Sequence, residues 1–413
     1  MPRICGWSLR DREVSIVENH EFTSAATSSG RVVEDQQRLM ARLPAMVDQI
    51  TDIVAIDSGS ANAAGVNAVL DSLSDGLRAA GFNLARHRVV GHGDCLEATL
   101  DIGAGPAVVV LGHADTVWPD GTAAGWPCRR DEQWIDGPGI GDMKAALVMA
   151  ATALSELAAE GAPGWGRVTL LVTPDELRGS AGSRALLERI ADRTDVCLTL
   201  EGVQSGGGMV VARGAVGAVT LTAHGRTAHC TETGGASVIS ELIELLPRIA
   251  ALTDADAGSL VSIGVLRAGT ARQVVPDFAE VEIDIRGVDV EVGLDVVNRL
   301  RALVDEPRHV PGVRVAMSGG LTRPAFGTDR SDALYTLAAS AAAELGLPSR
   351  PIRERGGSDG SFFGDRGVLI LDGLGPYCEN SCSRRERVDI ASIPQRGAVL
   401  LALLRTAAGI PTQ

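Results

Sequence analysis

Aromatic residues and positive charge are both scarce in this sequence. Only 3% of its 413 residues are Phe, Trp or Tyr, and 52 Asp and Glu outnumber 38 Lys and Arg, for a formal net charge of −14. Proteins that bind nucleic acids neutralise phosphates with Lys and Arg and stack bases on aromatic rings. The composition therefore excludes nucleic acid as an expected partner.

Long apolar runs are missing as well. The longest, at 398–404, is far shorter than the ~20 residues that cross a bilayer as a helix. The mixed charges of residues 1–18 do not resemble a signal peptide. Seven cysteines are an odd number, and their scatter over a large chain argues against a disulfide framework. We expect reduced thiols in a cytoplasmic protein with no membrane partner.

Short apolar runs alternate with helical patterns through much of the chain. The runs at 107–111, 167–172 and 196–200 predict strands that are buried on both faces of a sheet. Helical periodicity lies between them, at 142–159 and 184–191. This alternation predicts an α/β fold with a doubly wound, mostly parallel sheet.

The pattern changes in the middle of the chain, where alternating strands accompany two helical stretches, and it changes back after Gly319. We therefore expect an inserted α+β domain within a discontinuous main domain. The predicted divisions are a flexible N-terminal extension at 1–33, the main domain at 34–206 and 318–413, and the inserted domain at 207–317.

Acidic residues and a histidine lie where the predicted strands end. His113 and Asp115 follow the first buried run, Glu176 the second and Glu201 the third, and Asp142 begins a predicted helix. In open α/β sheets, ligands bind at the carboxyl ends of strands, and clustered carboxylates raise one another's pKa unless a cation lies among them. Taken alone, Asp142 is more simply a helix N-cap. Taken together, these residues predict a metal centre.

A competing motif occurs near the C-terminus. Residues 356–360 match the G-x-S-x-G pattern of the hydrolase nucleophile elbow. That arrangement needs a histidine after the serine, but the last histidine of this chain is His309. The order of the residues therefore argues against a serine triad.

A set of eight motifs occurs in a fixed order from about Val33 to the C-terminus: GHADTV, GPGIGDMK, TPDELRGSAGSR, LEG, HGRTAH, GGSDGSFF, GLGP and RVDIASIP. With these motifs the chain resembles the zinc aminoacylase, glutamate carboxypeptidase and succinyl-diaminopimelate desuccinylase family of metallohydrolases. The resemblance implies that the main domain is catalytic. It also implies that the inserted α+β domain serves as a lid and dimerisation domain.

The resemblance implies roles for the residues at the strand ends. His113 and Glu201 match ligands of one metal, and Asp142 matches an aspartate that bridges two metals. Asp115 matches the carboxylate that supports the metal-bound histidine, and Glu176 matches the general base that activates water.

Other matches concern the substrate. His229 matches a histidine that reaches the active site of a partner subunit and stabilises the oxyanion, which implies a homodimer. Arg286, Gly356 and Gly357 match positions that hold a substrate carboxylate. Gln273 stands where the family has a substrate-binding asparagine.

Two ligand positions depart from the family pattern. Leu177 stands where the family has a second metal-binding glutamate, and Cys382 stands where it has a histidine. Both departures fall on the same metal. The three remaining ligands match a mononuclear catalytic zinc, with one Zn²⁺ per subunit. Four roles stay open for Cys382: a fourth zinc donor, a ligand of a weaker second metal, a nucleophile, or a thiol without a role in the site.

We therefore expect a zinc-dependent hydrolase of an amide or related C–N bond, acting on a small carboxylated substrate such as an N-acyl amino acid or peptide. One alternative is a repurposed biosynthetic homologue that performs transfer, condensation or elimination. The departures at Leu177 and Cys382 motivate it, as does the Ala145-Ala146 pair where the family has Gly-Gly. Another alternative is a catalytically silent homologue that keeps only the fold.

Overall fold

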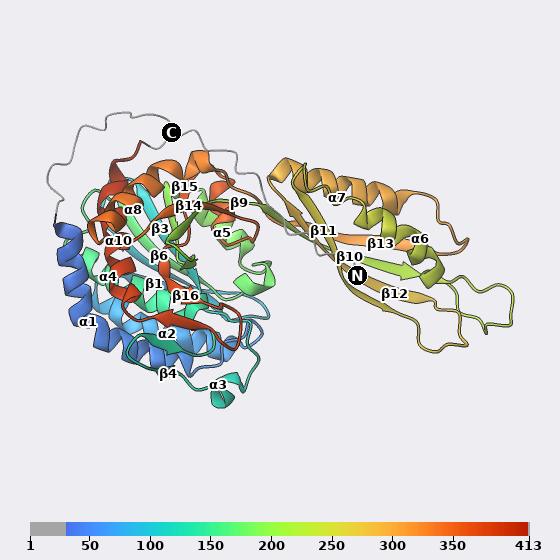
Figure 1. Ribbon diagram of the computed structural model, residues 1–413, viewed down its shortest axis with the longest axis horizontal. Coiled ribbons are helices and arrows are strands. Elements are labelled where there is room, and N and C mark those ends of the chain that lie inside the picture. The colour runs from blue at the N-terminus through green and yellow to red at the C-terminus, as the bar shows by residue number, and fades with distance from the viewer. Residues whose placement is uncertain (1–29, 412–413) are drawn as a thin grey trace.

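The computed structural model describes residues 30–411, which form a larger and a smaller lobe (Figure 1). The larger lobe contains both ends of the described chain, and the smaller lobe is built from its middle. Most of the predicted extension, residues 1–29, lies outside the described residues. Residues 31–33 already belong to helix α1 (Arg31–Val54), because Val32 is buried in the core of the larger lobe. In the described part of the chain, no helix is both long and apolar enough to span a bilayer.

The larger lobe is organised around a six-stranded sheet. Its middle strands run parallel, and an antiparallel pair closes one edge, which confirms the predicted doubly wound, mostly parallel sheet. In spatial order the strands are β1 (Asn83–Arg88), β2 (Asp94–Asp101), β6 (Arg167–Thr173), β3 (Ala107–His113), β7 (Val196–Thr199) and β15 (Leu369–Leu371).

Helices cover both faces of this sheet, which explains why its strands are apolar throughout. Successive side chains of a strand point to opposite faces. Val108 and Val110 of β3 pack into the main hydrophobic cluster, whereas Val109 and Leu111 pack into another. The main cluster involves α1, α2 (Ala63–Ala79), α4 (Ala145–Ala159), α8 (Asp332–Glu344) and α10 (Ser392–Thr406), and the other involves α5 (Arg184–Ala191) and α9 (Ser361–Gly364).

The smaller lobe is a four-stranded antiparallel sheet with two helices and a hydrophobic cluster of its own (Figure 1). In spatial order its strands are β11 (Ser259–Ala268), β12 (Phe278–Gly287), β10 (Ala215–His224) and β13 (Arg314–Arg323), and the helices are α6 (Val238–Ala250) and α7 (Val290–Asp305). The predicted domain boundaries at 206/207 and 317/318 stay a prediction. The sheet itself begins at Ala215, because β9 (Gly208–Arg213) pairs with β14 (Arg350–Glu354) of the larger lobe.

The two segments that connect the lobes pair with each other. The backbone N–H groups of Arg213 and Phe326 each donate to the other's carbonyl at 3.1 Å. The ten residues of β10 then span about 30 Å, at about 3.3 Å per residue, away from this connection. The fold therefore places the far ends of β10 and β12 well away from the strand tips of the larger sheet.

A five-stranded sheet lies beside the helix that follows Asp142. It contains β4 (Arg129–Arg130), β5 (Trp134–Asp136), β17 (Arg387–Asp389), β16 (Gly375–Glu379) and β8 (Gly202–Val203). The connection between β16 and β17 carries Cys382, and so brings the C-terminal part of the chain to the metal-ligand candidates.

Candidate metal centre

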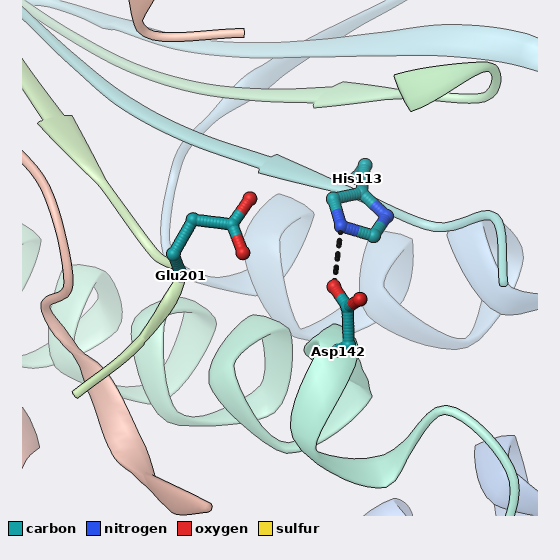
Figure 2. A group of neighbouring side chains, drawn as sticks. All are labelled: His113, Asp142 and Glu201. Carbon is teal, nitrogen blue, oxygen red and sulfur yellow. Dashed lines mark hydrogen bonds and ion pairs between the residues drawn. The ribbon is translucent and has the colours of Figure 1, made fainter. Parts of the chain in front are cut away.

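Three of the predicted metal ligands converge from separate segments (Figure 2). His113 is the last residue of β3, Glu201 follows β7 directly, and Asp142 lies in the turn before α4. One ligand atom from each of the three lies within 4.8 Å of the others, and His113 Nε2 is 2.9 Å from Asp142 Oδ1. Parallel strands that end at one edge of the sheet bring these groups together.

Asp142 does not cap the following helix. Helix α4 begins at Ala145, and its N-cap residue Lys144 receives no side-chain cap. Asp142 has a non-helical backbone (φ −129°, ψ 82°), which turns its carboxylate away from the helix end. The simple N-cap interpretation is therefore wrong. The carboxylate instead lies between His113 on one oxygen and Cys382, whose thiol donates to Oδ2 at 3.0 Å, on the other.

The chemistry of the three donors fits a divalent cation. Burial and the neighbouring Asp142 charge hold the pKa of Glu201 well above its ordinary value. Within residues 30–411, no side chain donates a hydrogen bond to the Glu201 carboxylate. A cation would relieve both costs, because imidazole nitrogen and carboxylate oxygen are the donors that zinc accepts.

Asp115 ties the His113 ring to the turn that carries Glu176. The backbone carbonyl of Asp115 lies 2.9 Å from His113 Nδ1. Since a carbonyl only accepts, Nδ1 donates to it. Nε2 faces the Asp142 carboxylate, and a cation bound there would take the place of the Nε2 hydrogen. The buried carboxylate of Asp115 accepts from Ser60 Oγ at 2.6 Å, and from the backbone N–H groups of Glu176 and Leu177 at 3.1 Å each.

Glu176 is a buried carboxylate beside these ligands, with only 6% of its surface exposed. Burial raises the pKa of Glu176 to about 7, although the positive charge of Arg323 opposes this rise. Arg323 Nη2 lies 2.9 Å from Glu176 Oε1. A carboxylate with a pKa near neutrality is suited to take up and release a proton.

Arg323 was missed by sequence reasoning, because none of the eight motifs contains it. It is the last residue of β13, and its guanidinium also donates to Ser180 Oγ at 3.0 Å. A Cβ atom on Gly357 would lie 2.6 Å from the Arg323 side chain, so the glycine allows the 356–357 loop to pack on it. The sequence offered no signal for this contact between distant segments.

A second buried arginine holds the Gly356–Gly357 loop from the other connecting strand. Arg213 donates to Asp372 Oδ2 at 2.6 Å and to the Gly356 carbonyl at 2.9 Å. Arg286, on the connection-side end of β12, pairs with Asp284 at 2.7 Å and donates to the carbonyl of Arg355 at 3.4 Å. The predicted carboxylate-holding residues Arg286, Gly356 and Gly357 therefore lie near one another.

His229 and Gln273 lie elsewhere. They belong to the loops beyond the far ends of β10 and β12, at the outer end of the smaller lobe (Figure 1). The backbone of Cys230 donates to the Gln273 carbonyl at 2.9 Å, and the exposed His229 ring contacts Thr231 Oγ1 at 2.7 Å. Within one chain, these two predicted site residues are separated from Glu176 by the length of the smaller sheet.

The second metal position of the family pattern lacks donors, as the sequence predicts. Leu177 has no ligating atom, and Cys382 contacts Asp142 alone among the ligand candidates. In the part of the chain that the structure describes, His113, Asp142 and Glu201 form the one group of three or more potential ligands. Burial and the nearby Asp142 charge raise the pKa of Cys382 to about 12, so it is a neutral thiol in this setting.

Comparisons with known proteins agree with this geometry. Residues 109–406 match the model of peptidase family M20/M25/M40. The chain is 25% identical over 367 residues to carboxypeptidase G2 of Pseudomonas sp. (strain RS-16), with 86% of this chain and 87% of that protein covered. It is 27% identical over 385 residues to the succinyl-diaminopimelate desuccinylase of Ruegeria pomeroyi, with 88% and 98% covered.

Among solved structures, the aminopeptidase PepT of Bacillus cereus aligns with a TM-score of 0.71 at 21% identity, covering 88% of this chain and 98% of that one. This likeness supports the two-lobed fold. The family match spans well over half of the sequence, so the chain belongs to peptidase family M20/M25/M40. It is a metal-dependent hydrolase that acts on amide-type C–N bonds.

Proposed function

We propose that the protein holds one zinc ion per subunit and hydrolyses the amide bond of a small carboxylated substrate, such as an N-acyl amino acid or a dipeptide. The observation that carries this proposal is the convergence of His113, Asp142 and Glu201 beside the buried Glu176. Zinc in such a site supplies Lewis acidity that makes water a nucleophile near neutral pH.

Glu176 is the general base and then the general acid of the proposed reaction. Its carboxylate accepts the proton of the attacking water and delivers it to the leaving amine nitrogen. Asp115 holds both partners of this chemistry in place, because it contacts the His113 ring and the backbone N–H of Glu176. The non-hydrolytic alternative has no observation in its favour, since the general base and the three ligands are all present.

The carboxylate of the substrate is assigned to the arginines at the lobe connection. Arg286 and the Gly356–Gly357 loop support this assignment, and Arg323 adds a guanidinium within reach of the same loop. Guanidinium groups bind carboxylates in a fixed, often bidentate geometry. Arg323 pairs with the carboxylate of Glu176 in this structure. When substrate binds, its guanidinium can pair with the substrate carboxylate in place of Glu176.

Cys382 is assigned a supporting role. Its thiol donates to the oxygen of Asp142 that faces away from His113. This hydrogen bond orients the carboxylate and occupies the position where a second cation would otherwise bind. The proposal thus has Cys382 as a positioning residue, with neither metal binding nor nucleophilic attack assigned to it.

The working unit is proposed to be a homodimer. His229 and Gln273 lie at the outer end of the smaller lobe, so a partner copy must supply them to each site, where His229 donates to the oxyanion. A groove on the same lobe fits such an interface. It is lined by exposed apolar residues of α6 and of the edge strand β11, among them Ile239, Ile243 and Leu266. The six cysteines of the described residues are free thiols, which fits the cytoplasm.

One measurement tests the core of this proposal. The purified protein should contain about one zinc per subunit and should release an amino acid from a panel of N-acyl amino acids and dipeptides. Chelation should abolish the release, and added zinc should restore it. Absence of bound metal, together with no cleavage across the panel, would refute the proposed function.

A further inference from the structure

The connection between β16 and β17 holds the backbone of the turn that carries Asp142. Glu386, a buried residue of this connection, accepts at Oε1 from the backbone N–H of Gly141 at 2.7 Å and from that of Asp142 at 3.0 Å. The bonded residues lie 245 and 244 positions apart in the sequence. None of the eight motifs contains Glu386, and the proposed reaction assigns it no role.

The C-terminal segment packs closely against the same turn. A Cβ atom on Gly141 would overlap Cys378 Sγ and would lie 3.4 Å from Glu386 Oε1, so the glycine admits both groups. The thiol of Cys382 donates to the side chain of Asp142. Asp142 is therefore held at its backbone N–H and at its carboxylate by one distant segment of the chain.

The far side of the turn is fixed by other contacts. Lys144, the residue before helix α4, is buried, and its Nζ donates to the backbone carbonyl of Ile56 at 2.7 Å. Its backbone N–H donates to the carbonyl of Gly139 at 3.0 Å. The start of α4 is thus secured without Glu386, which acts on the two residues just before it.

Asp142 has a second possible role, which competes with metal binding. A carboxylate just before a helix readily accepts from backbone N–H groups of the first turn. Helix α4 begins with no side-chain cap, so a carboxylate near its start has N–H groups to bind. The backbone of Asp142, at φ −129° and ψ 82°, instead directs the carboxylate to His113 (Figure 2). A contact that fixes this backbone decides between the two roles.

The surroundings of Glu386 are unfavourable for a carboxylate. Its other oxygen, Oε2, is buried and accepts no hydrogen bond within residues 30–411. A buried polar atom without a partner lowers the stability of the folded state. The contact of Oε1 with the turn therefore accounts for Glu386 better than a contribution to stability does.

Stacked arginines hold the chain on both sides of Glu386. Arg384 lies two positions before it, with the guanidinium carbon 5.1 Å from the Trp118 ring centroid. Arg387 follows it directly and lies 4.0 Å from the Trp134 ring centroid. These cation–π contacts fix the backbone that carries Glu386.

We propose that Glu386 is a positioning residue of the metal centre: it holds the backbone of Gly141 and Asp142 so that the Asp142 carboxylate faces the cation and not the start of α4. The inference rests on the proposed function and deepens it, because it adds a residue that touches neither the cation nor the substrate. The role depends on a hydrogen-bond acceptor at this place and not on its charge. A glutamine, whose amide oxygen accepts in the same way, would fill it.

The test is the affinity for zinc, measured on metal-free protein by competition with a chromophoric chelator. Glu386→Ala should bind zinc about 10- to 100-fold more weakly than the wild type, the usual loss when a residue behind a metal ligand is removed. Glu386→Gln should stay within about 3-fold of the wild type, because it keeps the acceptor oxygen. Glu241→Ala is the matched control: Glu241 is also a buried glutamate that accepts from a backbone N–H, at 2.8 Å from Val310, but it lies in the smaller lobe. Its loss should leave the affinity unchanged.

Cobalt(II) gives a second readout, since its visible absorption depends on the geometry of its ligands. We expect the spectrum of the cobalt-loaded protein to change in Glu386→Ala and to stay as in the wild type in Glu386→Gln and Glu241→Ala. Thermal unfolding of each metal-free variant is the control for folding. If Glu386→Ala does not fold, the exposed Arg384→Ala replaces it and should weaken zinc binding by about 3-fold or more, because it frees the connection.

The outcomes separate this inference from the proposed function, because neither readout needs turnover. If the variants bind zinc as expected but the wild type cleaves no amide, the proposed hydrolysis fails and the positioning role stands. If amides are cleaved and Glu386→Ala, or its substitute Arg384→Ala, keeps the zinc affinity of the wild type, the positioning role alone is overturned. A glutamine variant that binds zinc as weakly as the alanine variant would also overturn it.

Discussion

The two oxygens of the Asp142 carboxylate face very different surroundings. Oδ1 faces His113, with Glu201 within ligand distance and Asp115 behind the imidazole ring. Oδ2 accepts a hydrogen bond from the thiol of Cys382, and Leu177 stands in the sequence where the family has a further ligand of the metal on that side. One carboxylate therefore borders a site with three donors on one side and a site without a third donor on the other.

On the proposed function, this contrast means that a residue at a bridging position is not enough for a two-metal centre. The number of donors on each side decides whether a cation is held, because each buried carboxylate must be compensated. On the side of Oδ1, a cation would compensate the charges. On the side of Oδ2, a neutral thiol satisfies the oxygen by a hydrogen bond.

Removal of one side chain on each side of Asp142, the ligand His113 and the positioning residue Cys382, should give the largest difference. We expect His113→Ala to lower bound zinc from about one to near zero per subunit and to lower kcat/KM by more than about 10⁴-fold, because two carboxylates alone hold zinc weakly. Cys382→Ala should keep about one zinc and most of the activity. Metal analysis and steady-state kinetics on both variants check this, and an equal loss of zinc in both would show that the two sides do not differ.

Glu176→Gln should separate chemistry from metal binding on the Oδ1 side. The substitution removes the general base but no ligand, so kcat should fall by about 10²–10⁴-fold while bound zinc stays near one per subunit. Thermal unfolding should remain cooperative, which serves as the control for folding. Retention of full turnover by this variant would remove Glu176 from the mechanism.

His229, at the outer end of the smaller lobe, is proposed to act in the site of a partner copy. His229→Ala should lower kcat by about 10²-fold, as expected for loss of one oxyanion donor. When inactive His229→Ala and Glu176→Gln are mixed and allowed to exchange subunits, heterodimers carry one intact site, so about one quarter of the wild-type activity should return. A mixture that stays inactive, although heterodimers form, would contradict donation of His229 across the dimer.

Restoring the two missing donors should create a second metal site on the Oδ2 side of Asp142. The double variant Leu177→Glu with Cys382→His should bind about two zinc ions per subunit in place of one, because each side would then have three donors, with Asp142 counted on both. Each single variant is the matched control and should stay near one. The effect on kcat/KM with small acyl groups should be modest, within about 10-fold, since one zinc already suffices for the chemistry. No increase in bound zinc would mean that these two positions do not face Asp142 as argued.

Much of the architecture could be predicted from local pattern. The apolar runs around Val108 and Leu170 identified strands buried on both faces, and the side chains directly after them identified the edge where ligands gather. Asp142 was harder, because a carboxylate before a helix has a common capping role. Its backbone conformation and its contact with Cys382, 240 residues away, decided otherwise.

The sequence by itself determined the alternation of strands and helices, the residue types at the strand tips, and the absence of two ligands of one metal. These features follow from hydrophobic period and from chemical identity, which are properties of short segments. Only the tertiary structure decided that Arg323 lies against Glu176, that Leu177 and Trp118 line one cavity, and that His229 lies far from its own strand tips. Those contacts join segments distant in sequence, and their geometry is set by how whole lobes pack, which no local pattern encodes.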